Sequence, residues 1–234
     1  RSSTILPNTT LFRSLCQGGV TTVIWTITDL CDTLTFNNTF TVEPPLPVAF
    51  VQPADTTLQA CDLGSQADLQ NLFDNWLVSV RTEVENSLSG GCDPQIANNA
   101  DTLTVPSLCQ GGVTTVIWTI TDLCDTLTFN NSFTVEPPLP VAFVQPADTT
   151  LQACDLDSQA DLQNLFDNWL VSVRTEVENS LSNGCDPQIT NNADTLTLPS
   201  ACDGGIVTVV WTITDICDTL TFNNTFTVEP PLPV

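Results

Sequence analysis

The sequence predicts a mainly β protein made of tandem β-sandwich repeats, each with one long amphipathic helix inserted. The segment at 18–45 occurs three times, and its tryptophans Trp25, Trp118 and Trp211 are spaced 93 residues apart. Within each copy, β-branched or aromatic residues alternate with small polar ones, which is typical of paired strands with one buried face. Residues 65–88 instead show apolar spacings of three and four, which indicate a helix.

The repeat spacing divides the chain of 234 residues into a partial repeat at 1–46 and full repeats at 47–139 and 140–234. A full unit is long enough for one small core, and strands bounded by Pro, Gly and Asn-Asn signals favour a β-sandwich. Because Arg1 lies partway through a repeat, we expect a longer exported precursor. Half a sandwich cannot bury its own face, so the missing strands lie outside this sequence or come from a neighbouring chain.

Each repeat ends in a predicted β-hairpin followed by a proline-rich linker. In the first repeat the turn of the hairpin is at 30–34. The linker, Val-Glu-Pro-Pro-Leu-Pro, lies at 42–47, 135–140 and 228–233. Closely spaced prolines favour an extended polyproline conformation with few accessible states. We therefore expect adjacent repeats to hold a fixed or narrowly varying angle.

One helix is predicted in each full repeat, at 65–88 and 158–181. Ser65 with Asp68 resembles a capping box, and Ser-Gly-Gly ends the apolar pattern. A helix of this length spans about 35 Å, so we expect it to lie along the sheets. The predicted core anchors are two aromatic pairs, Phe73 with Trp76 and Phe166 with Trp169.

Ten cysteines, two in the partial unit and four in each full one, indicate disulfides. There is no Cys-x-x-Cys pair and no histidine, so the spacings typical of zinc and iron–sulfur sites are absent. An even number of cysteines per unit predicts an oxidising compartment, and hence a secreted or cell-surface protein.

Four cysteines allow three pairings within a unit. Cys61 and Cys92 flank a helix of about 35 Å. Cys109 and Cys124 flank a strand of roughly 33 Å, whereas a disulfide needs Cα atoms within about 7 Å. Cys61 is therefore left with Cys109 or Cys124, and a hairpin that brings Cys92 beside Cys109 favours Cys124. The favoured bonds are Cys92–Cys109, Cys61–Cys124, Cys185–Cys202 and Cys154–Cys217.

Several segments resemble one known group of repeats. They are Thr-Ile-Thr-Asp-Leu-Cys-Asp at 119–125, Cys-Gln-Gly-Gly at 109–112, and Phe-Asp-Asn-Trp-Leu at 73–77 followed by Gly-Gly-Cys at 90–92. In these the chain is similar to the cysteine-rich, immunoglobulin-like (hyalin-repeat-like) modules found in tandem in giant secreted surface proteins of Bacteroidota. The resemblance implies an immunoglobulin-like sandwich and a role in adhesins, gliding or capture appendages, or extracellular filaments. The chain departs from the pattern by its long helix and by lacking a further cysteine in the last strand.

The composition excludes several classes of function. The formal net charge is −23, with four arginines and no lysine, so neither nucleic acid nor an anionic membrane is an expected partner. No apolar run reaches the roughly 18 residues of a membrane span. Histidine, lysine and tyrosine are all missing, and with them the usual catalytic bases and amine nucleophiles, so we expect no enzyme activity.

Two kinds of surface site are candidates. Carboxylates near the unit ends could bind Ca²⁺, which prefers hard oxygen ligands, although solvated surface acids explain them equally well. The Asp-Thr-apolar pattern is similar to the acceptor of general O-glycosylation in the same bacterial group, although Asp and Thr also suit turns and strand starts. The candidate calcium ligands are Glu43, Asp62, Asp122 and Asp125, and the candidate glycan acceptors are Thr33, Thr102, Thr126 and Thr219.

These features favour two functions. Near-identical full repeats favour a structural role, a stiff shaft or stalk segment of an extracellular bacterial filament, appendage or giant adhesin, whose partners are neighbouring repeats and other copies in a fibre. The alternative is a multivalent adhesin module that recognises a glycan or a surface, with calcium as a candidate cofactor. Aromatic side chains confined to the core would favour the shaft, and an exposed aromatic cluster would favour binding.

Overall fold

The computed structural model describes residues 4–9 and 15–231. Residues 1–3 and 10–14 of the predicted partial repeat, and residues 232–234 of the last repeat, lie outside the described residues. The described chain is mainly β, as predicted. Its strands and α-helices are β1 (Thr4–Thr9), β2 (Gly19–Thr28), β3 (Thr33–Val42), β4 (Thr56–Gln59), α1 (Gln66–Ser87), β5 (Gln95–Asn98), β6 (Gly112–Thr121), β7 (Thr126–Glu136), β8 (Thr149–Gln152), α2 (Gln159–Ser180), β9 (Gln188–Asn191), β10 (Gly205–Thr214) and β11 (Thr219–Glu229).

By its internal contacts the chain divides into two compact units that do not follow the sequence repeats. One comprises Arg1–Thr56, Leu72–Thr104 and Thr114–Phe133, and the other comprises Thr57–Asn71, Val105–Val113 and Thr134–Val234. The linker at 42–47 therefore lies inside the first unit, and the linker at 135–140 lies inside the second. The predicted boundaries at 46 and 139 divide the sequence repeats and do not coincide with the division between these compact units.

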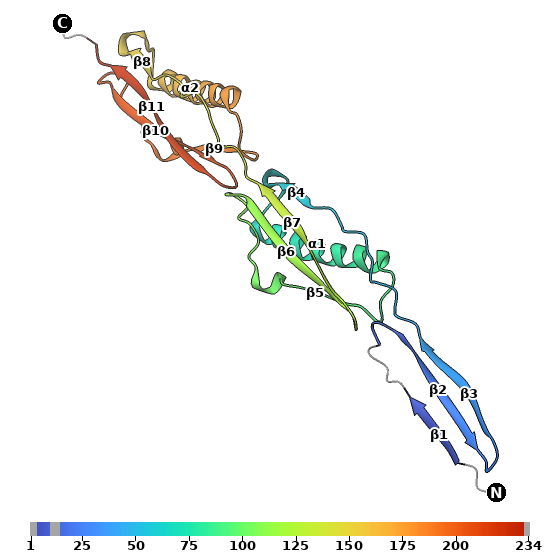
Figure 1. Ribbon diagram of the computed structural model, residues 1–234. Helices are drawn as coiled ribbons and strands as arrows, with labels where there is room; N and C mark the ends of the chain where they lie inside the picture. The colour runs from blue at the N-terminus through green and yellow to red at the C-terminus, as the bar shows by residue number, and fades with distance from the viewer. Residues whose placement is uncertain (1–3, 10–14, 232–234) are drawn as a thin grey trace. The chain divides into compact units, whose positions relative to one another are not determined.

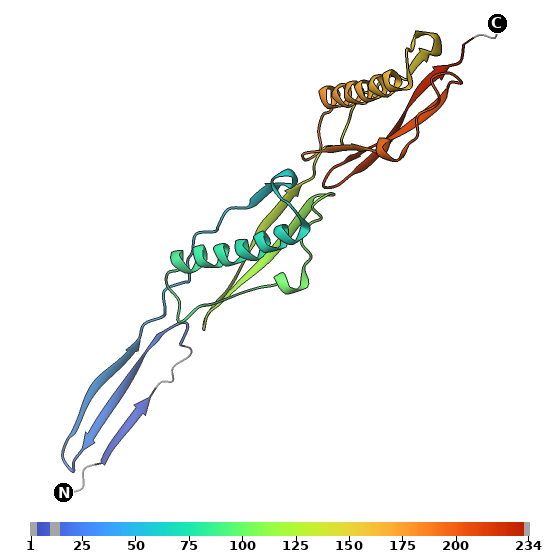
Figure 2. The ribbon, with the colours of Figure 1, turned by 180° about the vertical axis from the view of Figure 1, so that it is seen from behind.

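The third repeat contains one four-stranded sheet, in the order β8-β11-β10-β9. β10 is antiparallel to both of its neighbours, and β8 is parallel to β11. Along β10, Val207, Val209, Trp211 and Ile213 are buried and alternate with more exposed residues, as the period-2 pattern predicts. Helix α2 lies along one face of this sheet (Figures 1 and 2).

Helix α2 packs on the sheet through the predicted apolar stripe. Ser158 caps its N-terminus by accepting a hydrogen bond from the Asp161 N–H at 3.2 Å. Phe166 and Trp169 are buried, and their ring centroids lie 5.2 and 5.3 Å from that of Phe226 in β11. Neither helix of the described residues combines the length and apolar character needed to cross a membrane.

The second repeat has the same parts. Its sheet has the order β4-β7-β6-β5. Phe73 and Trp76 of α1 are buried, each with its ring centroid 5.2 Å from that of Phe133 in β7. Both helices thus begin and end within one residue of the predicted bounds at 65–88 and 158–181.

The two-sheet sandwich predicted from the sequence is not what the full repeats form. A sandwich needs a second sheet, but the four strands of each full repeat join edge to edge in a single sheet among the described residues. The short strands β4 and β8 extend that sheet beside β7 and β11 instead of starting another. The helix supplies the second layer, because its apolar stripe covers the buried face.

Among its described residues, the first repeat has three strands and no α-helix. Its sheet has the order β1-β2-β3. β1 pairs with β2 in the register that β5 adopts on β6: Ile5 lies opposite Ile27, as Ile96 lies opposite Ile120. All but the last residue of β3 are exposed.

Candidate functional site

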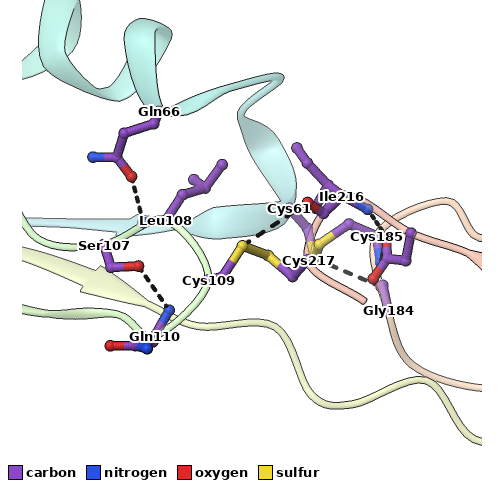
Figure 3. The surroundings of a disulfide bond; sticks show 11 residues. Cys61, Gln66, Ser107, Leu108, Cys109, Gln110, Gly184, Cys185, Ile216 and Cys217 are labelled. Atoms are coloured by element: carbon purple, nitrogen blue, oxygen red, sulfur yellow. Dashed lines mark hydrogen bonds between the residues drawn. A yellow bond between two sulfur atoms is a disulfide. The ribbon is translucent and has the colours of Figure 1, made fainter. Parts of the chain in front are cut away.

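Three disulfides join cysteines of consecutive repeats. Cys16 is bonded to Cys124 in the first unit, with a Cα–Cα distance of 5.3 Å. In the second unit Cys61 is bonded to Cys185 and Cys109 to Cys217, with Cα–Cα distances of 4.9 and 5.3 Å. Figure 3 shows these last two bonds in one close-up. Every one of the three bonds crosses a boundary between repeats.

The disulfides predicted within a repeat are therefore wrong. The sequence favoured Cys92–Cys109, Cys61–Cys124, Cys185–Cys202 and Cys154–Cys217, whereas Cys61, Cys109, Cys124, Cys185 and Cys217 all bond to another repeat. Cys92, Cys154 and Cys202 carry free thiols, as does Cys31.

The reason is visible in the third repeat. Cys185 is followed by β9, in which Gln188 pairs with Thr214 at the end of β10, whereas Cys202 lies just before β10 begins. A strand of ten residues spans roughly 33 Å. The segment between the two cysteines thus runs along the sheet and does not turn back as a hairpin, so the two thiols lie too far apart to bond.

Cys154 and Cys217 are separated in the same way. Cys154 follows β8, in which Gln152 pairs with Glu229 at the end of β11, and Cys217 precedes the start of β11. The first and third cysteines of a full repeat therefore lie at one end of its sheet, and the second and fourth at the other. We call the former forward cysteines, because they bond to the following repeat, and the latter backward cysteines.

Asp215 holds both backward cysteines of the third repeat in place. Its Oδ1 accepts hydrogen bonds from the Cys185 N–H at 2.9 Å and the Ile216 N–H at 2.7 Å. The Asp215 N–H in turn donates to the Asp218 carbonyl at 2.8 Å, which closes the turn that carries Cys217. One carboxylate thus fixes the backbone next to two disulfides.

Gln66, at the start of α1, holds the loop of the forward cysteine Cys109. Its Oε1 accepts from the Leu108 N–H at 2.8 Å, and its Nε2 donates to the Pro106 carbonyl at 3.0 Å. Gln159 makes the equivalent bonds to Ala201 and Pro199. Figure 3 shows the Gln66 bond beside the two disulfides. Helix α1 therefore positions the loop that carries Cys109, whose sulfur bonds to the next repeat.

The linker between the second and third repeats is attached on both sides. On the side of the second repeat, Gly111 has φ +65°, and a Cβ there would lie 2.5 Å from Pro137 Cδ. On the side of the third repeat, the Gly184 N–H donates to the Leu139 carbonyl at 3.0 Å. The prolines thus pack against one repeat while the linker backbone bonds to the next.

A pocket lies at the forward end of the third repeat. It has a volume of about 270 Å³, and both free forward cysteines, Cys154 and Cys202, line it. Ala201, which also lines it, stands where the second repeat has the buried Leu108. The equivalent thiols of the second repeat, Cys61 and Cys109, are both consumed in disulfides to the next repeat.

Two of the four carboxylates proposed for calcium lie in one turn. Asp122 and Asp125 share the turn between β6 and β7, where Asp122 Oδ1 accepts from the Cys92 N–H at 2.7 Å, as Asp215 does for Cys185. Glu43 and Asp62 are exposed. Among the described residues, no three His, Cys, Asp or Glu side chains are grouped so that they could hold a metal ion.

The four candidate glycan acceptors are all exposed. Thr33, Thr126 and Thr219 are the first residues of β3, β7 and β11. The Thr102 hydroxyl donates to the Asn99 carbonyl at 2.8 Å. Three of the four positions thus lie at the same turn of the hairpin in successive repeats.

No family model and no curated protein matches the chain. Among solved structures it is similar to two fragments of titin with three immunoglobulin domains, one of them an E-to-A mutated variant. Each is 8% identical and has a TM-score of 0.28, over 95% of this chain and 82% of the other. Likeness at this level carries no argument about fold or function, so the proposal below depends on the residues of this chain.

Proposed function

We propose that this chain is a structural segment, a shaft or stalk, of an extracellular bacterial filament or giant cell-surface adhesin. The observation that carries the proposal is the bonding of forward to backward cysteines across every boundary between repeats. Such bonds are rare in a reducing cytosol, which favours a secreted or surface location. They do not link two parts of the same repeat, and they stabilise the junction between two repeats.

We expect the junction between two consecutive repeats to be stiff. Each boundary combines a proline-rich linker with a backbone hydrogen bond from the next repeat to that linker. One disulfide joins the first repeat to the second, and two join the second to the third. Two disulfides at one boundary restrict bending and twisting of the two repeats more than the proline-rich linker does alone. The immunoglobulin-like relationship to surface proteins of Bacteroidota is part of this proposal.

A cleavage experiment tests the join directly. A protease recognition sequence is inserted between Pro138 and Leu139. The oxidised protein is cleaved with the protease, and the products are compared on denaturing gels with and without reductant. The two fragments should stay together until reductant is added. The control carries the same insertion with Cys61→Ser and Cys109→Ser and should separate at once. Separation of the parent protein without reductant would reject the proposal.

The extracellular shaft is tested on native material. Electron microscopy of cell-surface appendages labelled with antibody against the full repeat should show label at a regular axial spacing along the fibre. Label confined to the tip, or to the cytoplasm, would contradict a shaft.

The observation that favours the alternative, a multivalent binding module, is confined to the first repeat, where Phe36 and Phe40 are exposed. In the full repeats, none of the large exposed hydrophobic side chains among the described residues is aromatic. Calcium, O-linked glycans and the absence of enzyme activity remain predictions from the sequence. If calcium stiffened the shaft, a chelator would lower the melting temperature of the oxidised protein; the disulfide proposal expects no change.

A further inference from the structure

The sheet of the third repeat has a second face, which helix α2 does not cover. The helix packs on the face that carries Phe226, and Figures 1 and 2 show it on one side of this sheet. In β10 the side chains of the other face, which we call the outer face, are Ile206, Thr208, Val210, Thr212 and Thr214. Their partners across the hairpin in β11 are four threonines and Asn223.

This outer face is uncharged in a strongly acidic chain. The formal net charge is −23, yet within the four strands of the third repeat that the structure describes only Glu229, at the end of β11, carries a charge. The other acidic residues of the repeat lie in α2, in short 3-10 helices and in loops. A surface that met only water would be expected to share the charge that keeps the chain soluble.

Two positions of the outer face carry exposed, β-branched apolar side chains in every repeat. They are Val20, Val113 and Ile206 at the first position and Ile24, Ile117 and Val210 at the second, all between 36% and 67% exposed. These side chains lie outside the core of their own repeat and leave apolar surface in water. The cysteines that bond consecutive repeats lie at the ends of the sheet, so a neighbouring repeat of the same chain is not joined through this face.

We propose that the outer face binds the same face of a second copy of this chain, so that two shafts pack side by side, sheet against sheet. The second chain would then supply the second sheet that the sequence predicted within one repeat. Two acidic copies repel each other, and an uncharged face is where they can meet at least cost. Packed sheets lie about 10 Å apart, and α2 lies on the far side of its sheet. The helix carboxylates of the two copies would thus be separated by more than the Debye length of about 8 Å.

The size of the face predicts how strongly two copies pair. Two strands of about ten residues form a surface about 33 Å long and about 10 Å wide, or roughly 330 Å². A stable interface buries about 800 Å² on each partner, so one hairpin falls short and several together reach it. We therefore expect the contact to be weak in each repeat and to strengthen with the number of repeats that engage.

The test uses the full chain with its free thiols blocked by iodoacetamide, so that disulfides between copies play no part. Sedimentation equilibrium should show a reversible dimer, which higher salt strengthens because it screens the repulsion. Val113→Asp/Ile206→Asp places a charge on the outer face of two repeats and should raise the dissociation constant at least about tenfold. Val78→Asp/Val171→Asp adds the same charge at similarly exposed positions of α1 and α2 and should pair like the parent. Both variants should keep the parent's circular dichroism spectrum.

A photo-crosslink identifies what covers the outer face. Benzoylphenylalanine in place of Val210 should crosslink to the hairpin strands of a second copy, whereas in place of Val171 it should give no dimer. A monomeric parent, equal weakening by both double variants, or a crosslink to α2 of the second copy would overturn the inference.

The inference adds a contact between chains to the proposed shaft and does not depend on its disulfides. A monomeric parent whose fragments stay together after cleavage would leave the shaft standing and reject the pairing alone. The outer face of the third repeat has no aromatic side chain to stack on a sugar ring, which argues against a glycan as the occupant. Binding of cellohexaose by a monomeric parent, lost in Val113→Asp/Ile206→Asp, would assign the face to a glycan and overturn the pairing.

Discussion

The first hairpin, β2 and β3, and the last, β10 and β11, have nearly the same sequence but different surroundings. Their pairing is the same: Trp25 lies opposite Phe36 and Trp211 opposite Phe222, with ring centroids 6.1 Å apart in both. The burial of their side chains differs between the two hairpins. The hairpin sequence therefore determines strand pairing locally, while the helix determines whether its apolar face is buried.

The largest difference should come from the aromatic ring that contacts the helix. Phe226 is 0% exposed, whereas Phe40, its equivalent in the first hairpin, is 63% exposed. Phe226→Ala should lower the free energy of unfolding by about 3–5 kcal/mol, because it leaves a cavity under Phe166 and Trp169. Phe40→Ala should cost about 0.5 kcal/mol or less. Urea denaturation of both variants measures this, and equal losses would mean that the helix is not what buries the face.

The same comparison applies to equivalent thiols. Cys109 is bonded to Cys217, which closes a loop with a sequence separation of 108 residues, whereas Cys202 is free. In the chain-entropy model, a bond closing such a loop stabilises by up to about 4.7 kcal/mol, and less here because Cys61–Cys185 already joins the same repeats. Cys109→Ser should therefore lower the melting temperature and Cys202→Ser should not. An equal response of the two variants would contradict the assigned pairing.

The strands and helices could be predicted from the sequence, whereas the disulfide bonds at the junctions between repeats could not. Periodicity predicted the strands and both helices, because side chains on one buried face repeat every two or about 3.6 residues along the chain. The pairings Cys92–Cys109 and Cys185–Cys202 were mispredicted because the segment between the two cysteines was taken for a hairpin, whereas in the third repeat it continues along β10. Every repeat has the same cysteine spacing, so spacing alone does not distinguish a bond within a repeat from one to the next.

The residues that hold the junction were missed for a related reason. Asp122 was proposed as a calcium ligand because it is acidic and lies near the end of a unit, yet its carboxylate accepts a backbone hydrogen bond. Gln66 drew no attention, since a glutamine at the start of a helix is common. Its recurrence at Gln159, at the same spacing from Cys109 and Cys202, was the available signal.

A smaller effect is expected from the carboxylate beside the backward cysteines. Asp215 accepts from two backbone N–H groups, including that of Cys185, whereas Asp29 in the first repeat accepts from Leu30 beside a free thiol. Asp215→Ala should cost about 1–3 kcal/mol by leaving these donors unpaired. It should also slow formation of Cys61–Cys185 during oxidative refolding. Asp29→Ala is the matched control and should leave that rate unchanged; slowing by both variants would indicate a general effect of charge.

The smallest expected effect is a dependence on pH at the start of the sheet in the third repeat. The backbone N–H of Thr225 in β11 donates to Asp148 at 2.7 Å and lowers the pKa of that carboxyl below its usual 3.8. A pKa lower in the folded than in the unfolded state contributes stability above the unfolded value, and this is lost as the pH falls through the folded value. The difference in unfolding free energy between the parent and Asp148→Asn should therefore shrink on acidification. Asp157→Asn, which changes an exposed carboxyl where the second repeat has Gly64, is the charge-matched control and should show a smaller change. A ¹³C titration that places the Asp148 pKa at or above 3.8 would refute the assignment.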